Sequence, residues 1–317
     1  MKGKQGMVCM GLLLVLSSCH TGKQITASGL QRKDFQTEVN GQHTDLFTLS
    51  NKQGMEVCIT NYGARVVSIL VPDRNGKRED VVCGFSTITE YMEQRQNFGS
   101  TVGRYIGRIL NARFTLDGVE YKLVPNNGKS GHISHGGNPG FADRIWKVEQ
   151  ADTHRVRLSY LSPDGENGFP GNLKVTLVYS LGEDDNALDL TYEATTDAPT
   201  VLNLSHHSFF NISGNFTKSV EDQQLWVDAD RFTPYDDKKC VTGEYLPVAG
   251  TPLDFRMPHA IGECIDADHP QLKVVNGYDH TWELNTKGDD TRPAAWVLDP
   301  ASGRKMEIFT NEPGKQI

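Results

Sequence analysis

Short segments rich in β-branched and aromatic residues recur along this chain, and turn residues separate them. The segments lie at residues 56–61, 65–71, 156–161, 173–181, 187–194 and 295–298. Only residues 87–94 show a helical pattern, and that segment is short. Many short strands with turn signals between them are typical of an all-β sandwich, so the sequence predicts that fold class.

The turn signals and the lack of a linker indicate one domain, whereas the length alone allows either one large β domain or two smaller ones. Asp117-Gly118 separates two strand-like runs and predicts a hairpin, while residues 182–186 and 299–304 connect further strand pairs. The 317 residues, 37% of them hydrophobic, are enough to bury a large core. No internal repeat or linker interrupts residues 36–317. We therefore expect a single folded domain over that range.

The first residues are typical of a bacterial export signal. Lys2 and Lys4 precede an apolar run over residues 7–16, which is too short to span a membrane as a helix. The sequence Leu16-Ser-Ser-Cys19 follows and resembles a lipobox, in which the cysteine is lipidated and becomes the mature N-terminus. We predict a signal peptide over residues 1–18, a lipidated Cys19 and a polar tether over residues 19–35. Ordinary secretion, with no role for Cys19, is the alternative.

These features indicate where the protein acts and what it can bind. A lipid anchor would hold it at the cell envelope, in the periplasm or at the outer membrane, as its only membrane contact. A net charge of −8 without a basic cluster argues against nucleic acid. The cysteines beyond Cys19 show no zinc-type spacing, so no metal is expected, and a disulfide among them stays open. Small neutral ligands remain the natural partners.

Two adjacent histidines stand in a strand-like segment, residues 203–211. Side chains alternate across a strand, so His206 and His207 are predicted to face opposite sides. The face of His207 also carries Asn203, Ser205 and Phe209, which suits a polar ligand of sugar size. The face of His206 is more nearly core. His207 is therefore the candidate functional residue.

Several other motifs accompany this segment in a fixed order. They are Gly-Arg-Tyr-Ile-Gly-Arg-Ile at 103–109, His-Gly-Gly at 135–137 and Gly-Tyr-Asp-His at 277–280, with further matches at 61–64, 162–171, 231–234, 242–255 and 311–314. In order and spacing the chain resembles the aldose 1-epimerases, also called galactose mutarotases, over nearly everything after residue 35. The resemblance implies a single large β-sandwich of the galactose mutarotase-like kind.

The resemblance also implies a reaction and a set of site residues. Family members interconvert the α and β anomers of hexoses such as galactose or glucose by acid and base catalysis, without a cofactor. By resemblance, His207 is the general acid and His135 hydrogen-bonds near the ring oxygen. Arg108, Asp279 and Gln316 match residues that bind sugar hydroxyls. Without the resemblance, each of these side chains has an ordinary role in a core, a loop or a turn.

Two departures from the family pattern bear on activity. Gly107 stands where the family has asparagine, so one amide contact to the sugar is expected to be missing. The sequence ends at Ile317, whereas family members continue through a Leu-Glu-Thr-Gln motif whose glutamate is the general base. We expect the C-terminal strands and the base to be absent, and loss of such a base typically costs about 10²–10⁴-fold in rate.

Two alternatives to an active epimerase follow from that expectation. One is a non-catalytic carbohydrate-binding protein that keeps Arg108, His135, His207 and Asp279 but lacks the base. The other is a truncated product that does not fold, because missing strands would leave sheet edges uncovered. In every case the expected partner is a small aldohexose, and the protein is expected to be a monomer.

Overall fold

The structure of this protein is a computed structural model, and it describes residues 24–317. The predicted signal peptide, Cys19 and the start of the predicted tether lie outside the described residues. Residues 24–35 differ from a tether, because Phe35 is completely buried at the end of the short helix η1 (Arg32–Phe35). The Nε of Arg32 also donates to Asp45 at 2.7 Å. The folded body therefore begins before residue 36.

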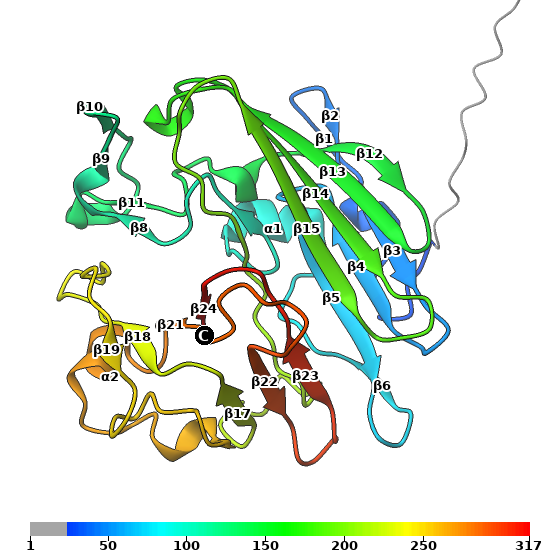
Figure 1. Cartoon of the computed structure of the whole chain (residues 1–317). Helices are drawn as coiled ribbons and strands as arrows, with labels where there is room; N and C mark the ends of the chain where they lie inside the picture. Colours follow the sequence, from blue (N-terminus) through cyan, green and yellow to red (C-terminus); the bar gives the residue numbers. More distant parts are fainter. Residues whose placement is uncertain (1–23) are drawn as a thin grey trace, which may run out of the picture.

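Two four-stranded antiparallel sheets form the first half of the molecule (Figure 1). One sheet has the order β3–β4–β5–β6, with strands Leu46–Ser50, Glu56–Thr60, Arg65–Pro72 and Arg78–Asp80. The other has the order β12–β13–β14–β15, with strands Lys147–Ala151, Arg155–Ser162, Leu173–Leu181 and Leu188–Thr196. The inner faces of the two sheets share one hydrophobic core.

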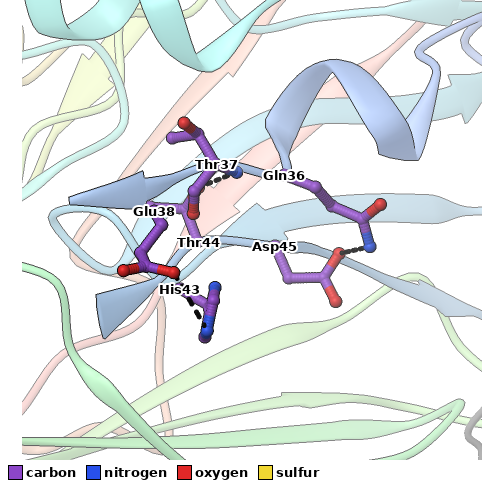
Figure 2. A pocket seen from close by; sticks show the side chains of 6 residues that line it. All are labelled: Gln36, Thr37, Glu38, His43, Thr44 and Asp45. Atoms are coloured by element: carbon purple, nitrogen blue, oxygen red, sulfur yellow. Dashed lines mark hydrogen bonds and ion pairs between the residues drawn. The ribbon is translucent and has the colours of Figure 1, made fainter. Parts of the chain in front are cut away.

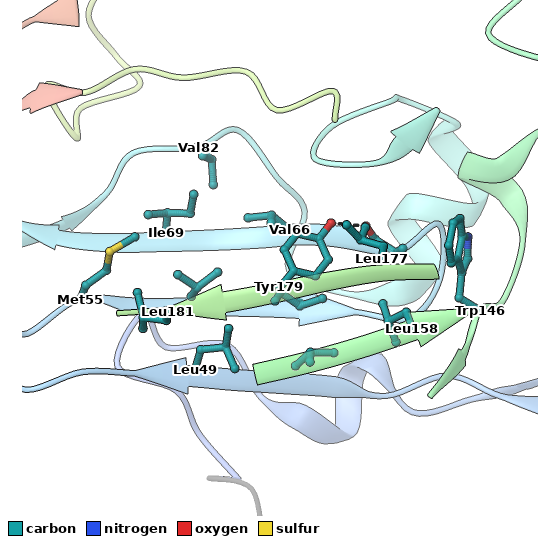
Figure 3. Packing of buried hydrophobic residues seen from close by; sticks show 14 of the residues in the cluster. Leu49, Met55, Val66, Ile69, Val82, Trp146, Leu158, Leu177, Tyr179 and Leu181 are labelled. Carbon is teal, nitrogen blue, oxygen red and sulfur yellow. Dashed lines mark hydrogen bonds between the residues drawn. The ribbon is translucent and has the colours of Figure 1, made fainter. Parts of the chain in front are cut away.

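Alternation along β14 shows how the sequence builds that core. Leu173, Val175, Leu177, Tyr179 and Leu181 are all buried, and they occupy every second position. Side chains two apart share one face of a strand, so this face packs on the opposite sheet (Figure 3). The hydroxyl of Tyr179 donates at 2.7 Å to the backbone carbonyl of Ala64, which directly precedes β5 of that sheet, so its polar end is satisfied inside the core.

Two smaller antiparallel sheets form the second half. One has the order β20–β17–β22–β23, with strands His259–Ala260, Gln224–Val227, Ala295–Leu298 and Lys305–Ile308. The other has the order β19–β18–β21–β24, with strands Leu246–Pro247, Arg231–Thr233, Thr281–Glu283 and Gly314–Gln316. A second core lies between them around Trp282, and half-buried Val297 packs against both cores. The two halves are thus continuous through apolar packing.

Short strand pairs, two short α-helices and five further 3-10 helices complete the described elements; the 3-10 helices are η2 (Leu110–Ala112), η3 (Gly128–Ser130), η4 (Phe141–Asp143), η5 (Glu166–Gly168) and η6 (Ile261–Glu263). The pairs are β1 (Glu38–Val39) with β2 (Gln42–His43), β7 (Thr101–Val102) with β16 (Ser205–His206), β8 (Arg108–Ile109) with β11 (Ile133–Ser134), and β9 (Arg113–Leu116) with β10 (Val119–Lys122). The helices are α1 (Ile88–Gln94) and α2 (Pro270–Val275). The predicted all-β class, the helix near residue 87 and the Asp117-Gly118 hairpin are confirmed. None of the helices in residues 24–317 is long and apolar enough to cross a membrane.

The prediction of one strand over residues 203–211 is wrong. Only Ser205–His206 forms a strand, paired with β7. The segment changes neighbours along its length: the N–H of His207 donates to Ser100, whereas the carbonyl of Phe209 accepts from Cys83 and the N–H of Asn211 donates to Val81. A segment that moves from one neighbour to another cannot form a continuous ladder, although its local backbone is extended enough to resemble one.

Candidate active site

His135 and His207 come together although 72 positions separate their numbers in the chain. His135 follows strand β11, and His207 follows strand β16. Their ring centroids are 5.2 Å apart and the rings are nearly perpendicular. Phe209 lies beside His207, with ring centroids 5.1 Å apart. Two imidazole side chains from distant segments therefore share one half-buried position next to an aromatic ring.

The backbone of Gly107 fixes the ring of His135. The N–H of His135 donates to the Gly107 carbonyl at 2.9 Å, and the N–H of Gly107 donates to Nδ1 of His135 at 3.3 Å. Because Nδ1 accepts a hydrogen bond, the neutral ring carries its proton on Nε2. His135 thus presents an N–H donor rather than a lone pair on its outer nitrogen. Gly107, which stands where the family has asparagine, thus orients His135 through its backbone N–H and carbonyl.

Burial keeps His135 neutral. Burial, followed by the positive charges of His207 and Arg108, lowers the pKa of His135 to about 4. Removing an imidazolium from water disfavours its charged form, and nearby cations add to that effect. At neutral pH the side chain therefore acts as a hydrogen-bond donor through Nε2.

The two adjacent histidines lie in different surroundings. The ring of His206 is 5.9 Å from Tyr179 of the core, and burial chiefly lowers the pKa of His206 to about 3. Burial also lowers the pKa of His207, but a hydrogen bond to its own backbone and the negative charge of Asp279 oppose the shift. Among these histidines, His207 is the one whose charged form a carboxylate supports. That is what a proton donor needs.

Asp279 and Gln316 form the other side of the site. Nε2 of Gln316 donates to Oδ1 of Asp279 at 2.6 Å. Gln316 lies on β24, opposite Thr281 of β21, and Asp279 precedes β21. The structure therefore joins two of the three predicted hydroxyl-binding residues directly, and it places the carboxylate close enough to His207 for its charge to act there.

Arg108 stands at the edge of this group. Its Nη1 donates to the backbone carbonyl of Lys239 at 2.9 Å, so part of its hydrogen-bonding capacity is used within the protein. Its positive charge acts on both His135 and Tyr235. The guanidinium thus lies near the predicted site, anchored on one side and half-buried.

Tyr235 lies near the site although no sequence motif included it. Burial, followed by the charge of Asp279, raises the pKa of Tyr235 to about 12, so the phenol keeps its proton at neutral pH. Gln271 of α2 holds the backbone of Tyr235 on both sides: its Oε1 accepts from the N–H at 2.8 Å, and its Nε2 donates to the carbonyl at 3.0 Å. The only sequence signal was position, since Tyr235 directly follows the motif at 231–234.

Two further features of the described residues lie apart from this group. Within residues 24–317, no group of three or more His, Cys, Asp or Glu side chains is arranged to hold a metal ion. A surface hollow lies at the β1–β2 hairpin, where Nε2 of His43 is 3.7 Å from a carboxylate oxygen of Glu38 (Figure 2). That hollow contains none of the predicted site residues.

Comparisons with known proteins agree on one family. A family model described as aldose 1-epimerase matches residues 45–317. The galactose mutarotase of Sus scrofa is 37% identical over 271 residues, which cover 86% of this chain and 76% of the relative. The aldose 1-epimerase of Escherichia coli (strain K12) is 35% identical over 278 residues, covering 88% and 79%.

Solved structures give the same result. An aldose epimerase homologue from C. elegans superposes with a TM-score of 0.78 at 31% identity, covering 86% of this chain and 81% of that one. Galactose 1-epimerase from Lactobacillus acidophilus NCFM superposes with a TM-score of 0.77 at 30% identity, covering 88% and 79%. Likeness at this level extends over most of the chain.

Proposed function

The chain belongs to the aldose 1-epimerase family, and we propose that its site interconverts the α and β anomers of an aldohexose such as galactose or glucose. It is an isomerase by family, and its galactose mutarotase-like sandwich is the expected fold. One observation carries the proposal for the site. The ring centroids of His135 and His207 are 5.2 Å apart, and the negative charge of Asp279 acts on His207.

The reaction needs what this arrangement offers. Opening the ring requires a proton at the ring oxygen while another leaves the anomeric hydroxyl; the carbonyl end then rotates and the ring recloses. We assign the first proton to His207, because Asp279 supports its charged form. The Nε2–H of His135 donates to the same region and holds the ring oxygen in place. No cofactor is required by this chemistry.

The carboxylate side holds the sugar. Asp279 accepts hydrogen bonds from hydroxyls, and its second oxygen is available for them while Oδ1 accepts from Gln316. Arg108 adds donors at the edge of the site. Among the described residues we assign the acid and the hydroxyl contacts, and water accepts the proton that leaves the anomeric hydroxyl.

Polarimetry with the purified protein tests this function. Freshly dissolved α-galactose or α-glucose should approach its anomeric equilibrium faster than in buffer, with chelator present and no nucleotide added. A folded protein that binds the sugar without accelerating the change would instead indicate a carbohydrate-binding protein. Folded protein that neither binds nor accelerates would contradict the assignment. Light scattering of the same sample tests the expectation of a monomer.

We also propose that the protein is a lipoprotein of the cell envelope. The support is the Leu16-Ser-Ser-Cys19 sequence after a short apolar run. Radiolabelled palmitate should enter the protein expressed in a bacterium and should not enter the Cys19→Ser variant. Export of Cys19→Ser without any difference in labelling would indicate ordinary secretion.

A further inference from the structure

We propose that Asn167 is a positioning residue for His135, an inference that rests on the proposed function of the site. Nδ2 of Asn167 donates to the carbonyl of Gly136 at 2.9 Å and to that of Pro139 at 2.9 Å. Those two carbonyls belong to the loop that begins at His135 and turns back toward the sandwich. One side-chain amide thus ties both arms of the loop that carries the donor histidine.

The loop has no room to move toward Asn167. A Cβ atom placed on Gly137 would lie 2.5 Å from the amide of Asn167, which shows how closely the loop packs on that side chain. His135 itself has a φ of 51°, a left-handed conformation that is uncommon for a residue with a side chain. Such a backbone persists only where its surroundings hold it, and the Asn167 amide supplies two of the bonds that do so.

A buried cation holds the two ends of the segment that contains Asn167. Arg104 is 1% exposed and donates to the carbonyls of Ser162 at 3.0 Å and Gly171 at 2.8 Å, at the two ends of the segment that contains Asn167. The carbonyl of Asn167 accepts from the N–H of Val124 at 3.0 Å. The side chain of Asn167 therefore projects from a segment that is hydrogen-bonded at both ends, and it contacts the His135 loop directly.

The chemistry of the amide sets a sharp test. Two carbonyls need two N–H groups, which an amide supplies and an isosteric carboxylate does not. Asn167 also has a φ of 51°, which asparagine, aspartate and glycine tolerate better than alanine. Asn167→Asp therefore removes the donors while keeping shape and backbone preference, and Asn167→Gly removes the whole side chain without backbone strain.

Asn172 offers a matched control on the same segment. Its Nδ2 donates to Asp197 at 2.7 Å and its Oδ1 accepts from the N–H of Asp164 at 3.0 Å, so its side chain is also hydrogen-bonded, but to partners outside the His135 loop. Asn172→Asp changes the same chemical group by the same amount. A general effect on the segment should appear in both variants, and an effect on His135 only in those at Asn167.

Two measurements on the full-length protein separate the possibilities. The first is ¹⁵N-histidine NMR, in which Nδ1 and Nε2 shifts report which ring nitrogen carries the proton; His135→Asn assigns the signal. The second is the kinetics of mutarotation. We expect Asn167→Asp and Asn167→Gly to weaken the Nε2–H preference of His135 and to lower kcat about 10- to 100-fold with a smaller change in KM. Asn172→Asp should match the unmodified protein in both.

The outcomes are distinguishable from failure of the proposed function. If the unmodified protein does not accelerate mutarotation, the function is contradicted, and the NMR comparison still decides the role of Asn167. An unchanged His135 signal in folded Asn167→Asp or Asn167→Gly overturns the inference. Equal changes at Asn167 and Asn172 also overturn it. If Asn167→Asp does not fold, Asn167→Gly supplies the same comparison.

Discussion

The two sides of the site are held in different ways. The histidine side is fixed by backbone contacts: Gly107 bonds the ring and the main chain of His135, and Asn167 bonds the loop that follows. The carboxylate side depends on one side-chain bond between Gln316 and Asp279, and β24, which carries Gln316, has a single neighbour in its sheet. Position is thus imposed on the first side, whereas the second has more freedom to adjust.

The electrostatics of the two sides differ in the same sense. Burial lowers the pKa of His135 and of His207, so it disfavours the positively charged form of both histidines. Asp279 on the other side supplies a negative charge that acts back on His207. The difference indicates two separate functions. The histidine side, with His135 and His207, holds its proton donors in fixed positions. The carboxylate side, with Asp279 and Gln316, binds hydroxyls and stabilises the charged form of His207.

The largest effect on turnover is expected from one of two neighbouring histidine substitutions. His207→Ala should lower turnover by about 10²–10⁴-fold, because it removes the proton donor. His206→Ala should lower it far less, because that ring faces Tyr179 in the core. Initial rates by polarimetry are the measurement, with circular dichroism to confirm folding. Comparable losses in two folded variants would show that the assignment of the two histidines is wrong.

The pH dependence of stability should follow the buried histidines. The pKa of His135 is lowered to about 4 and that of His206 to about 3, against about 6.5 in the unfolded chain. The unfolded state therefore binds more protons below pH 6.5. Their contribution to stability is complete above about pH 6.5 and is lost as the pH falls from there through the folded-state pKa values, toward about pH 3.

Urea unfolding at pH 7 and pH 5 measures this loss. His206→Asn should make the stability less dependent on pH than in the unmodified protein, since one of the buried groups that must take up a proton is gone. An equal dependence in both proteins would mean that His206 is accessible to solvent in the folded state.

Loss of the charge on Asp279 should act on both sides of the site. Asp279→Asn replaces a charged acceptor by a neutral one, so KM should rise about tenfold, as expected for a charge-assisted hydrogen bond. Asp279 raises the pKa of His207, so its removal lowers that pKa further and shifts the basic limb of the activity profile to lower pH. A rise in KM with an unshifted profile would separate Asp279 from the acid.

The smallest effect is expected at Gln316. Gln316→Ala removes the donor to Asp279 and leaves that carboxylate free to bind water or sugar, so KM should rise only a few-fold and kcat should stay the same. Titration of the sugar against initial rate measures both constants. A fall in kcat as large as that of His207→Ala would mean that the carboxylate side is as strictly positioned as the histidine side.

Local patterns predicted the regular strands well. The run 173–181 and the run 295–298 are strands over the same residues, because alternation of apolar side chains is a property of neighbouring positions. The segment around His207 was predicted poorly, because its backbone bonds go to two separate neighbours. The partner of each backbone hydrogen bond is set by the long-range path of the chain, and the residue types in the segment do not indicate it.

The sequence by itself determined the fold class, the family resemblance and the identity of the candidate residues, since these rest on side-chain types and their spacing. The tertiary structure decided how those residues relate: that His135 and His207 lie 5.2 Å apart, that Gly107 fixes the tautomer of His135, and that Asn167 holds its loop. These contacts join segments far apart in the chain, and several of them are made by backbone groups, which every residue carries. A sequence cannot indicate which of many identical backbone groups will meet a given side chain, because only the folded path of the chain selects it.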